Sequence, residues 1–392
     1  MSQEKPLQVN HDDLIHDIAY NYYGTRFATC GSDQCIKVWD YNKEANSWVL
    51  NDSWKAHDSS VICLNWAHPE FGEILASCSL DRSVKIWIEQ KNVETNSGKR
   101  WAPAASFLES RGAIHSIAFS PEYMSITLAV ASSEGIVRFY SPHDTTSLQN
   151  WDTHSQINAV LGGAKDSDGP LIVTWCPARF SQAAMIAVGC SKENKVKIYS
   201  KDSSNWKLLL DVDSYDSPIL TLQWAPHMGR SYHLIAVGCA DGSISVYHLW
   251  LDLYSGKRNI ESDDDLFRYE NDYGLNNDNA LLDTSGTAAR LGLSNEDGQY
   301  ALDDEDDNEA RESPPNGAIS DSLKSYIQNF KPHCELKAKW IAHGGLPVRK
   351  LRWNITGTQL VSSGDDGYAR TWRKAANDKW KCMLAVAPEK NN

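Results

Sequence analysis

Short apolar runs, many of them rich in β-branched residues, alternate with turn-forming residues along most of the chain. The stretch RFATCGSDQCIKVWD, which ends at Asp40, contains two such runs joined by Gly-Ser-Asp. Apolar and polar residues that alternate with a period of two indicate β-strands with one buried face, and small polar clusters between them indicate turns. The pattern therefore predicts an all-β protein built from hairpins.

This hairpin pattern recurs six times, and each copy closes on an aromatic anchor. The anchors are Trp39, Trp87, Tyr140, Tyr199, Tyr247 and Trp372. Six positions before each anchor lies an acidic residue: Asp33, Asp81, Glu134, Glu193, Asp241 and Asp366. Another aromatic residue lies 19 to 24 positions before each anchor. After each anchor comes a fourth run that contains a tryptophan. Each unit thus supplies four short strands.

Four-stranded sheets that repeat at this period, with a Trp-Asp pair closing the first unit, are typical of WD40 β-propeller blades. We predict a six-bladed propeller. The acidic position lies in a tight turn, where its side chain accepts backbone N–H bonds. Histidines that pair with this residue in such repeats occur at His11, His57 and, one place out of register, His343. Blades 3 to 5 are expected to have weaker hydrogen-bond networks.

An insertion interrupts blade 5. Residues 1–250 are expected to hold most of blades 1 to 5, residues 251–330 the insertion, and residues 331–392 the end of blade 5 and blade 6. The insertion has 19 Asp or Glu against 6 Lys or Arg, which accounts for the net charge of −13 of the whole chain. Such a composition favours disorder. It is either a solvated loop without a specific partner or the carrier of a recognition segment at 266–269.

Composition and motifs argue against most other classes of function. The acidic balance disfavours direct nucleic-acid binding, and neither a signal sequence nor an apolar stretch of bilayer length is present, so a soluble intracellular protein is expected. The nine cysteines include no CxxC pair, and four of them recur at one small buried slot. Phosphate-loop, HExxH and GxSxG motifs are absent. We therefore expect no enzyme activity, no cofactor and no metal site.

The last unit already owns its fourth strand, residues 379–386, so the N-terminal segment 6–10 has no vacant place there. We therefore expect a ring that is open between blades 1 and 6, where a protein partner adds strands to unpaired backbone. Candidate partner-binding residues follow from the register of the blades: Leu7, Val9, Leu14, Ile15, Val348 and Leu351. Each of them could equally pack inside its own blade.

Several stretches go beyond the general repeat, among them HDDLIHDIAYNYYGTRFATCGSDQCIKVWD, TWCPARFS, APHMGRSYHLIAVGCADG and WNITGTQLVSSGDDGYARTW. With them the chain resembles the Seh-one nucleoporins, relatives of the Sec-thirteen coat proteins, over all six blades. The resemblance implies an open propeller that an α-helical scaffold nucleoporin completes with a blade in trans, in the Y-shaped coat of the nuclear pore at the nuclear envelope. It also implies a second assembly, called SEA in fungi and GATOR in animals, on the cytoplasmic face of the vacuole or lysosome, which regulates TOR signalling.

Two other functions remain open at this point. A substrate receptor of a ubiquitin ligase, or a histone-binding protein, would use the narrow top face of a closed ring. A vesicle-coat subunit of the Sec-thirteen type would share the architecture but join a different complex. The acidic insertion and the quoted stretches favour the nucleoporin.

Overall fold

The computed structural model describes residues 9–145, 148–178, 183–202, 205–212, 214–251, 332–376 and 379–387. The chain divides into two compact units, one formed by Met1–Ser255 with Lys331–Asn392 and the other by Gly256–Phe330. The second unit lies outside the described residues, as do Leu7 and the segment 266–269. The proposed boundaries and character of the insertion therefore stay predictions.

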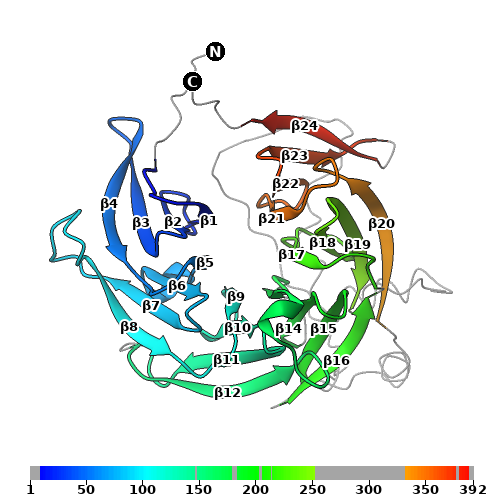
Figure 1. The fold of residues 1–392 in the computed structure, drawn as a ribbon, viewed down its shortest axis with the longest axis horizontal. Helices are drawn as coiled ribbons and strands as arrows, with labels where there is room; N and C mark the ends of the chain where they lie inside the picture. Colours follow the sequence, from blue (N-terminus) through cyan, green and yellow to red (C-terminus); the bar gives the residue numbers. More distant parts are fainter. Residues whose placement is uncertain are drawn as a thin grey trace, which may run out of the picture. The chain divides into compact units, whose positions relative to one another are not determined.

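The first unit consists of six antiparallel sheets, each made of four consecutive strands (Figure 1). Blade 1 consists of β1 (Ile15–Tyr20), β2 (Arg26–Gly31), β3 (Cys35–Asn42) and β4 (Ser47–Lys55). Blade 2 consists of β5 (Val61–Trp66), β6 (Ile74–Ser79), β7 (Val84–Glu89) and β8 (Trp101–Phe107). Blade 3 consists of β9 (Ile114–Phe119), β10 (Leu128–Ser132), β11 (Ile136–Pro142) and β12 (Trp151–Asn158). Blade 4 consists of β13 (Leu171–Trp175), β14 (Met185–Cys190), β15 (Lys195–Asp202) and β16 (Asn205–Val212). Blade 5 consists of β17 (Ile219–Trp224), β18 (His233–Cys239), β19 (Ser243–Trp250) and β20 (His333–Ile341). Blade 6 consists of β21 (Val348–Trp353), β22 (Gln359–Gly364), β23 (Ala369–Lys374) and β24 (Trp380–Val386).

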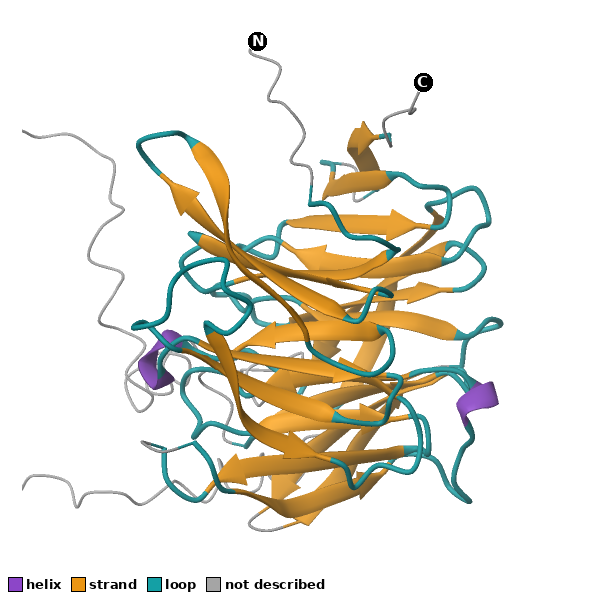
Figure 2. Ribbon diagram, turned by 60° about the vertical axis from the view of Figure 1, so that its left-hand side comes forward, coloured by secondary structure: helices purple, strands orange, loops and turns teal. Residues whose placement is uncertain are grey.

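The predicted fold class, a six-bladed all-β propeller, is confirmed. Figure 2 shows the strands stacked with short loops at both of their ends. Within the described part of the chain, the helical elements are two 3-10 turns, Pro69–Phe71 and Asp166–Asp168, and no helix there is long and apolar enough to cross a bilayer. Outside the strands, the described chain therefore consists of loops and these two turns.

The core consists of separate apolar layers between neighbouring blades. Each anchor aromatic from blade 2 onward packs into the layer that its blade shares with the preceding one; these anchors are Trp87, Tyr140, Tyr199, Tyr247 and Trp372. Trp39 of blade 1 has no preceding blade and stacks instead on Phe27 of its own sheet, with ring centroids 6.0 Å apart. The repeat thus leaves one anchor without its usual neighbour.

Burial along the strands shows which blades lack a neighbour. Strands β10 and β14 of the inner blades are buried at every position, because both faces of these sheets are covered. In β1 the side chains of Ile18 and Tyr20 are exposed, and in β22 the side chain of Val361 is exposed, as expected when only one face is covered. Blade 1 and blade 6 therefore each have a free face, which we define as the face turned away from blade 2 and from blade 5, respectively.

No strand pairing joins blade 1 to blade 6 in the described residues, and the four strands of blade 6 all come from its own repeat. The N-terminal residues that are described lie on blade 1, where Lys37 Nζ donates to the carbonyl oxygens of Val9 and Asn10. The open ring predicted from the last repeat is thus confirmed. Both blades have the four strands that the sequence predicts, with β1, β4, β21 and β24 at the sheet edges, and the addition of strands by a partner stays a prediction.

Candidate protein-binding site between blades 6 and 1

Side chains on the innermost strands link neighbouring blades around the ring axis. At five junctions, a side-chain oxygen of one blade accepts a backbone N–H of the next. The pairs are Asp17 with Leu64 (3.1 Å), Asn65 with Phe119 (3.0 Å), Ser116 with Val173 (3.2 Å), Thr174 with Trp224 (3.4 Å) and Thr221 with Leu351 (3.2 Å). A buried N–H without an acceptor destabilises a fold, so each of these bonds holds its junction closed.

The junction between blades 6 and 1 uses charge instead. Lys350 Nζ lies 3.3 Å and Arg352 Nη2 3.5 Å from Asp17 Oδ1, and Asp17 is only 4% exposed. Burial by itself would raise the pKa of Asp17, but Lys350, Arg352 and the Leu64 N–H outweigh it and lower the pKa. Asp17 in turn raises the pKa of Lys350 against the effect of burial. The first and last blades are therefore joined near the axis by an ionised cluster.

Farther from the axis, the two free faces present apolar side chains to solvent. On blade 1, Ile18 is 47% and Tyr20 57% exposed. On blade 6, Val361 is 40% and Leu384 58% exposed, and the cross-strand register places both on the face opposite to the buried Leu360. Exposed apolar side chains on two facing sheets are typical of a protein interface.

The free face of blade 1 also carries an aromatic cluster. Trp48 lies 4.6 Å from Phe27, 5.9 Å from Tyr20 and 5.1 Å from Tyr41, measured between ring centroids. At two complete junctions the corresponding indole of the outer strand stacks on a tryptophan of the preceding blade, as in the pairs Trp54–Trp101 and Trp340–Trp380. Trp48 has no preceding blade to supply such a ring.

The indole of Trp39 differs from its equivalents in the same way. Trp87 Nε1 and Trp372 Nε1 each donate to a serine Oγ at 2.8 Å. Trp39 Nε1 is buried and has no hydrogen-bond partner among the described residues. The equivalent hydroxyl, Thr29 Oγ1, contacts His11 Nε2 at 2.9 Å, as the two serines contact His57 and His343. The anchor of blade 1 thus lacks the indole hydrogen bond that the anchors of blades 2 and 6 make.

The residues that the sequence predicted for partner binding differ in their exposure in the structure. Leu14 and Ile15 are exposed, by 71% and 41%, and Val9 is half-buried on blade 1. Val348 and Leu351 are fully buried in the layer between blades 5 and 6. Their expected position beside the ring opening is therefore corrected, because strand alternation turns them toward blade 5. A binding role for any of the six residues remains a prediction.

Sequence reasoning missed the residues that form the free faces and the ionised cluster. They are Asp17, Ile18, Tyr20, Lys350, Arg352, Val361 and Leu384. One available signal was the apolar Ile18 and the aromatic Tyr20 on β1, which begins the first blade and so has no earlier sheet to cover it. The ion pairs had no local signal, because Asp17 and Lys350 lie at opposite ends of the chain.

The repeated acidic residues have the structural role that their register predicts. Oδ1 of Asp33, Asp81, Asp241 and Asp366 accepts the backbone N–H two residues later, at 2.9 to 3.1 Å. The predicted histidine pairs are also present. His11, His57 and His343 lie 2.7, 2.9 and 2.8 Å from Asp33, Asp81 and Asp366, respectively. These networks fix the hairpins of blades 1, 2 and 6.

In blades 3 and 4 the acidic residue pairs with a cation on the following strand, as Asp366 of blade 6 also does beside its histidine. Glu134 pairs with Arg138 at 2.5 Å, and Glu193 pairs with Lys197 at 2.6 Å. The sequence signal that could have revealed these pairs is a basic residue four positions after the acidic one. Lys197 Nζ also donates to Ala159 O of blade 3 at 2.7 Å, so this substitute network links two blades.

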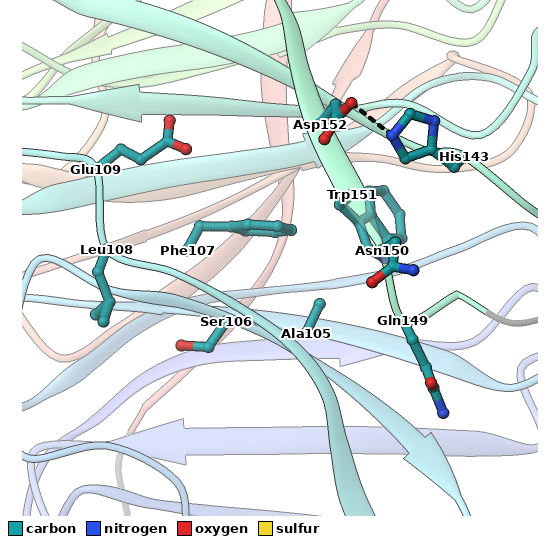
Figure 3. Close-up of a pocket in the computed structure, with 10 residues that line it drawn as sticks. All are labelled: Ala105, Ser106, Phe107, Leu108, Glu109, His143, Gln149, Asn150, Trp151 and Asp152. Carbon is teal, nitrogen blue, oxygen red and sulfur yellow. Dashed lines mark ion pairs between the residues drawn. The ribbon is translucent and has the colours of Figure 1, made fainter.

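A shallow cavity of about 470 Å³ lies between the outer strands of blades 2 and 3 (Figure 3). His143 forms an ion pair with Asp152 at 2.6 Å, and Glu109 lies apart from this pair (Figure 3). Glu109 is already held by the Tyr140 hydroxyl at 3.2 Å. The titratable groups of this cavity thus do not converge on one point. Elsewhere in the described residues, no three His, Cys, Asp or Glu side chains are grouped to hold a metal ion.

Comparison with known proteins agrees with this architecture. The family model described as "WD domain, G-beta repeat" matches residues 4–40, 48–87 and 334–373. These ranges contain the acidic turn and anchor of blades 1, 2 and 6, the same blades that have the histidine networks. Blades 3 to 5 depart from the repeat, as the sequence predicted.

Curated relatives match almost the whole chain. The Saccharomyces cerevisiae protein named Nucleoporin SEH1 is 32% identical over 98% of this chain and 99% of its own length. Nucleoporin seh1 of Schizosaccharomyces pombe is 32% identical over 98% of this chain and 96% of its own length. The human Nucleoporin SEH1 is 28% identical over 96% of this chain and 86% of its own length.

Proposed function

The chain belongs to the SEH1 family of nucleoporins, and from this premise we propose that it is a structural subunit of the Y-shaped coat complex of the nuclear pore. In this role it binds an α-helical scaffold nucleoporin that inserts a blade between blades 6 and 1. We assign no catalytic step to it. Its proposed location is the nuclear pore at the nuclear envelope.

The observation that carries this proposal is the pair of free faces on blades 1 and 6. Ile18 and Tyr20 on one side, and Val361 and Leu384 on the other, offer apolar area to a sheet placed between them. Such a sheet would give Trp39 the neighbour that every other anchor has. Because both terminal blades are complete, the partner packs through side chains against the two faces and brings its own strand pairing.

We further propose that the same surface serves the second assembly implied by the family resemblance. This is the SEA or GATOR complex on the cytoplasmic face of the vacuole or lysosome, which regulates TOR signalling. One ring opening holds only one inserted blade, so a single molecule joins one of the two assemblies at a time. Variants of the free faces therefore reduce recovery of both assemblies together.

The test is a pull-down of the tagged full chain from cell extract at low salt, with mass spectrometry of the stoichiometric partners. We expect α-helical scaffold nucleoporins or subunits of the nutrient-signalling complex. The double variant Ile18→Asp with Val361→Asp should lose them, because it puts a charge on each free face. Leu161→Asp is the matched control, since Leu161 is 87% exposed on a loop that follows blade 3.

Other outcomes point to other functions. Recovery of vesicle-coat subunits in place of nucleoporins would assign the chain to the Sec-thirteen type of complex. Recovery of ubiquitin-ligase subunits would indicate a substrate receptor that uses the top of the ring, and the free-face variant would then bind as well as the wild type. Equal recovery of nucleoporins by the double variant and by the control would contradict the proposed site.

A further inference from the structure

Two cysteines face each other across the first two strands of blade 2. Cys63 on β5 and Cys78 on β6 are directly opposite in the antiparallel register, and both pack in the apolar layer between blades 2 and 3. Opposite residues on antiparallel strands have Cα atoms about 4.5–5.5 Å apart, within the range of about 4.4–6.8 Å that a disulfide spans. Both thiols are free in this structure, so the register places two reduced cysteines at bonding range.

This pairing distinguishes blade 2 from the other blades that have a cysteine nine positions before their anchor. Those cysteines are Cys30 of blade 1 and Cys190 of blade 4, and they face Asp17 and Leu171, respectively. Burial raises the pKa of Cys190 to about 12 and that of Cys30 well above its ordinary value. Thiols of this kind are structural and inert, because the thiolate is the reactive form.

Cys63 is the more acidic thiol of the pair in blade 2. It is 7% exposed, whereas Cys78 is fully buried. A hydrogen bond from the Cys78 thiol lowers the pKa of Cys63 against burial and the charge of Asp17, and the charge of Lys350 adds to the lowering. Burial, and next to it the contact with Cys63, raise the pKa of Cys78. The nucleophilic thiolate is therefore favoured at Cys63, with a protonated thiol beside it.

We propose that Cys63 and Cys78 are a site of reversible oxidation by hydrogen peroxide, which joins them in an intramolecular disulfide. The Cys63 thiolate attacks one peroxide oxygen, the O–O bond breaks, and the hydroxide that leaves takes up a proton from solvent to form water. Cys63 is then a sulfenic acid. The Cys78 sulfur attacks the Cys63 sulfur, the S–O bond breaks, and the hydroxyl leaves with the Cys78 proton as a second water. Two thiols and one peroxide thus give one disulfide and two waters.

The site lies apart from the surface proposed for the inserted blade. Cys63 Sγ is 3.9 Å from Leu64 O and 4.0 Å from Ile117 O of blade 3, and the layer that contains it is shared by blades 2 and 3. The free faces belong to blades 1 and 6, so a partner between them leaves this layer as it is. Oxidation of the pair is therefore independent of the proposed function.

The first measurement is peptide mass spectrometry of the native full chain after exposure to hydrogen peroxide, denaturation, alkylation of the remaining thiols and digestion with trypsin. Both cysteines fall in the single tryptic peptide 56–82. We expect this peptide to become two hydrogens lighter and to resist alkylation until a reductant is added. The peptide that contains Cys190 should oxidise about tenfold more slowly, because its thiol is not activated.

Three results would overturn the proposal. One is a fully alkylated peptide 56–82 at a peroxide dose that oxidises the exposed Cys382. Another is oxidation of this peptide no faster than that of the Cys190 peptide. The third is a Cys63→Ser variant in which Cys78 still loses its alkylation, since Cys78 should then have no disulfide partner.

The second measurement tests the activation of Cys63 through its charged neighbours. Lys350→Gln removes the cation that lowers the pKa of Cys63 and should slow disulfide formation several-fold, whereas Asp17→Asn removes an anion that raises it and should speed the reaction. A loosened blade junction would instead speed oxidation in both variants, with Cys190 oxidised faster as well. Acceleration in both variants would show that the thiols react only in opened molecules and would overturn the proposal.

Discussion

The ionised cluster that joins the ends of the ring allows a quantitative test through Asp17. Asp17 has two functions in the structure: its Oδ2 accepts the Leu64 N–H at 3.1 Å, and its Oδ1 faces Lys350 and Arg352. Asp17→Ala removes both interactions. Asp17→Asn keeps a side-chain oxygen for Leu64 but removes the charge. The two variants therefore separate the hydrogen bond from the ion pairs.

The expected magnitudes follow from burial. Leu64 is fully buried, and leaving its N–H without an acceptor costs about 1–3 kcal/mol. The side chains of Lys350 and Arg352 are 32% and 44% exposed, so solvent screens them and each ion pair contributes about 0–1 kcal/mol. Asp17→Ala should then lower the free energy of unfolding by about 2–4 kcal/mol and Asp17→Asn by about 1 kcal/mol.

Urea unfolding of the full chain at pH 7, followed by tryptophan fluorescence, measures these differences. Thr221→Val is the matched control, because Thr221 makes the equivalent bond to Leu351 without an ion pair. In 1 M NaCl the Debye length falls to about 3 Å, so the effect of Asp17→Asn should shrink while that of Thr221→Val should not.

The contribution of Asp17 to the free energy of unfolding depends on pH in a direction that its pKa shift defines. The folded-state pKa of Asp17 is lowered, so the charged form stabilises the fold above the ordinary aspartate pKa and this contribution is lost as pH falls through the folded-state value. The difference between the wild type and Asp17→Asn should therefore narrow in acid. Two results would refute the role of the cluster. One is a stability difference between the wild type and Asp17→Asn that is the same at pH 7 and at pH 3, and the other is an Asp17→Ala variant that is as stable as the wild type.

Three further predictions concern the blades and the free faces. His57→Ala should lower the free energy of unfolding by about 2–3 kcal/mol, because it removes the buried bonds of the imidazole to Ser77 and Asp81. His143→Ala, whose side chain is 66% exposed, should change it little in the same urea assay. The pKa of Asp81 is lowered, since its bonds to His57 and Ser83 outweigh burial, so stability should decline below about pH 4 and Asp81→Asn should flatten that decline; an unchanged pH profile would contradict this. The isolated chain should aggregate through its free faces and melt at a higher temperature when co-purified with its partner, whereas equal melting temperatures by differential scanning fluorimetry would argue against an inserted blade.

The sequence by itself determined the repeat and therefore the fold. Six aromatic anchors such as Trp39, each with an acidic residue six positions earlier, place every hairpin and its turn. His57 and Asp81 were found as a pair because the repeat places a histidine 22 to 24 residues before the acidic residue in blades 1, 2 and 6. Such features depend on contacts inside one blade, where residues are close in the chain and alternation assigns each side chain to a face.

Only the tertiary structure decided what each face meets. Alternation distinguishes Leu351 from Arg352 but does not say which of the two turns toward blade 5, and the sequence-based placement of Leu351 beside the ring opening was corrected for that reason. The contact between Asp17 and Lys350 joins residues at opposite ends of the chain. A contact of this kind depends on how the first and last blades are placed around the axis, and the local periodicity that predicts strands contains no information about which strands become neighbours.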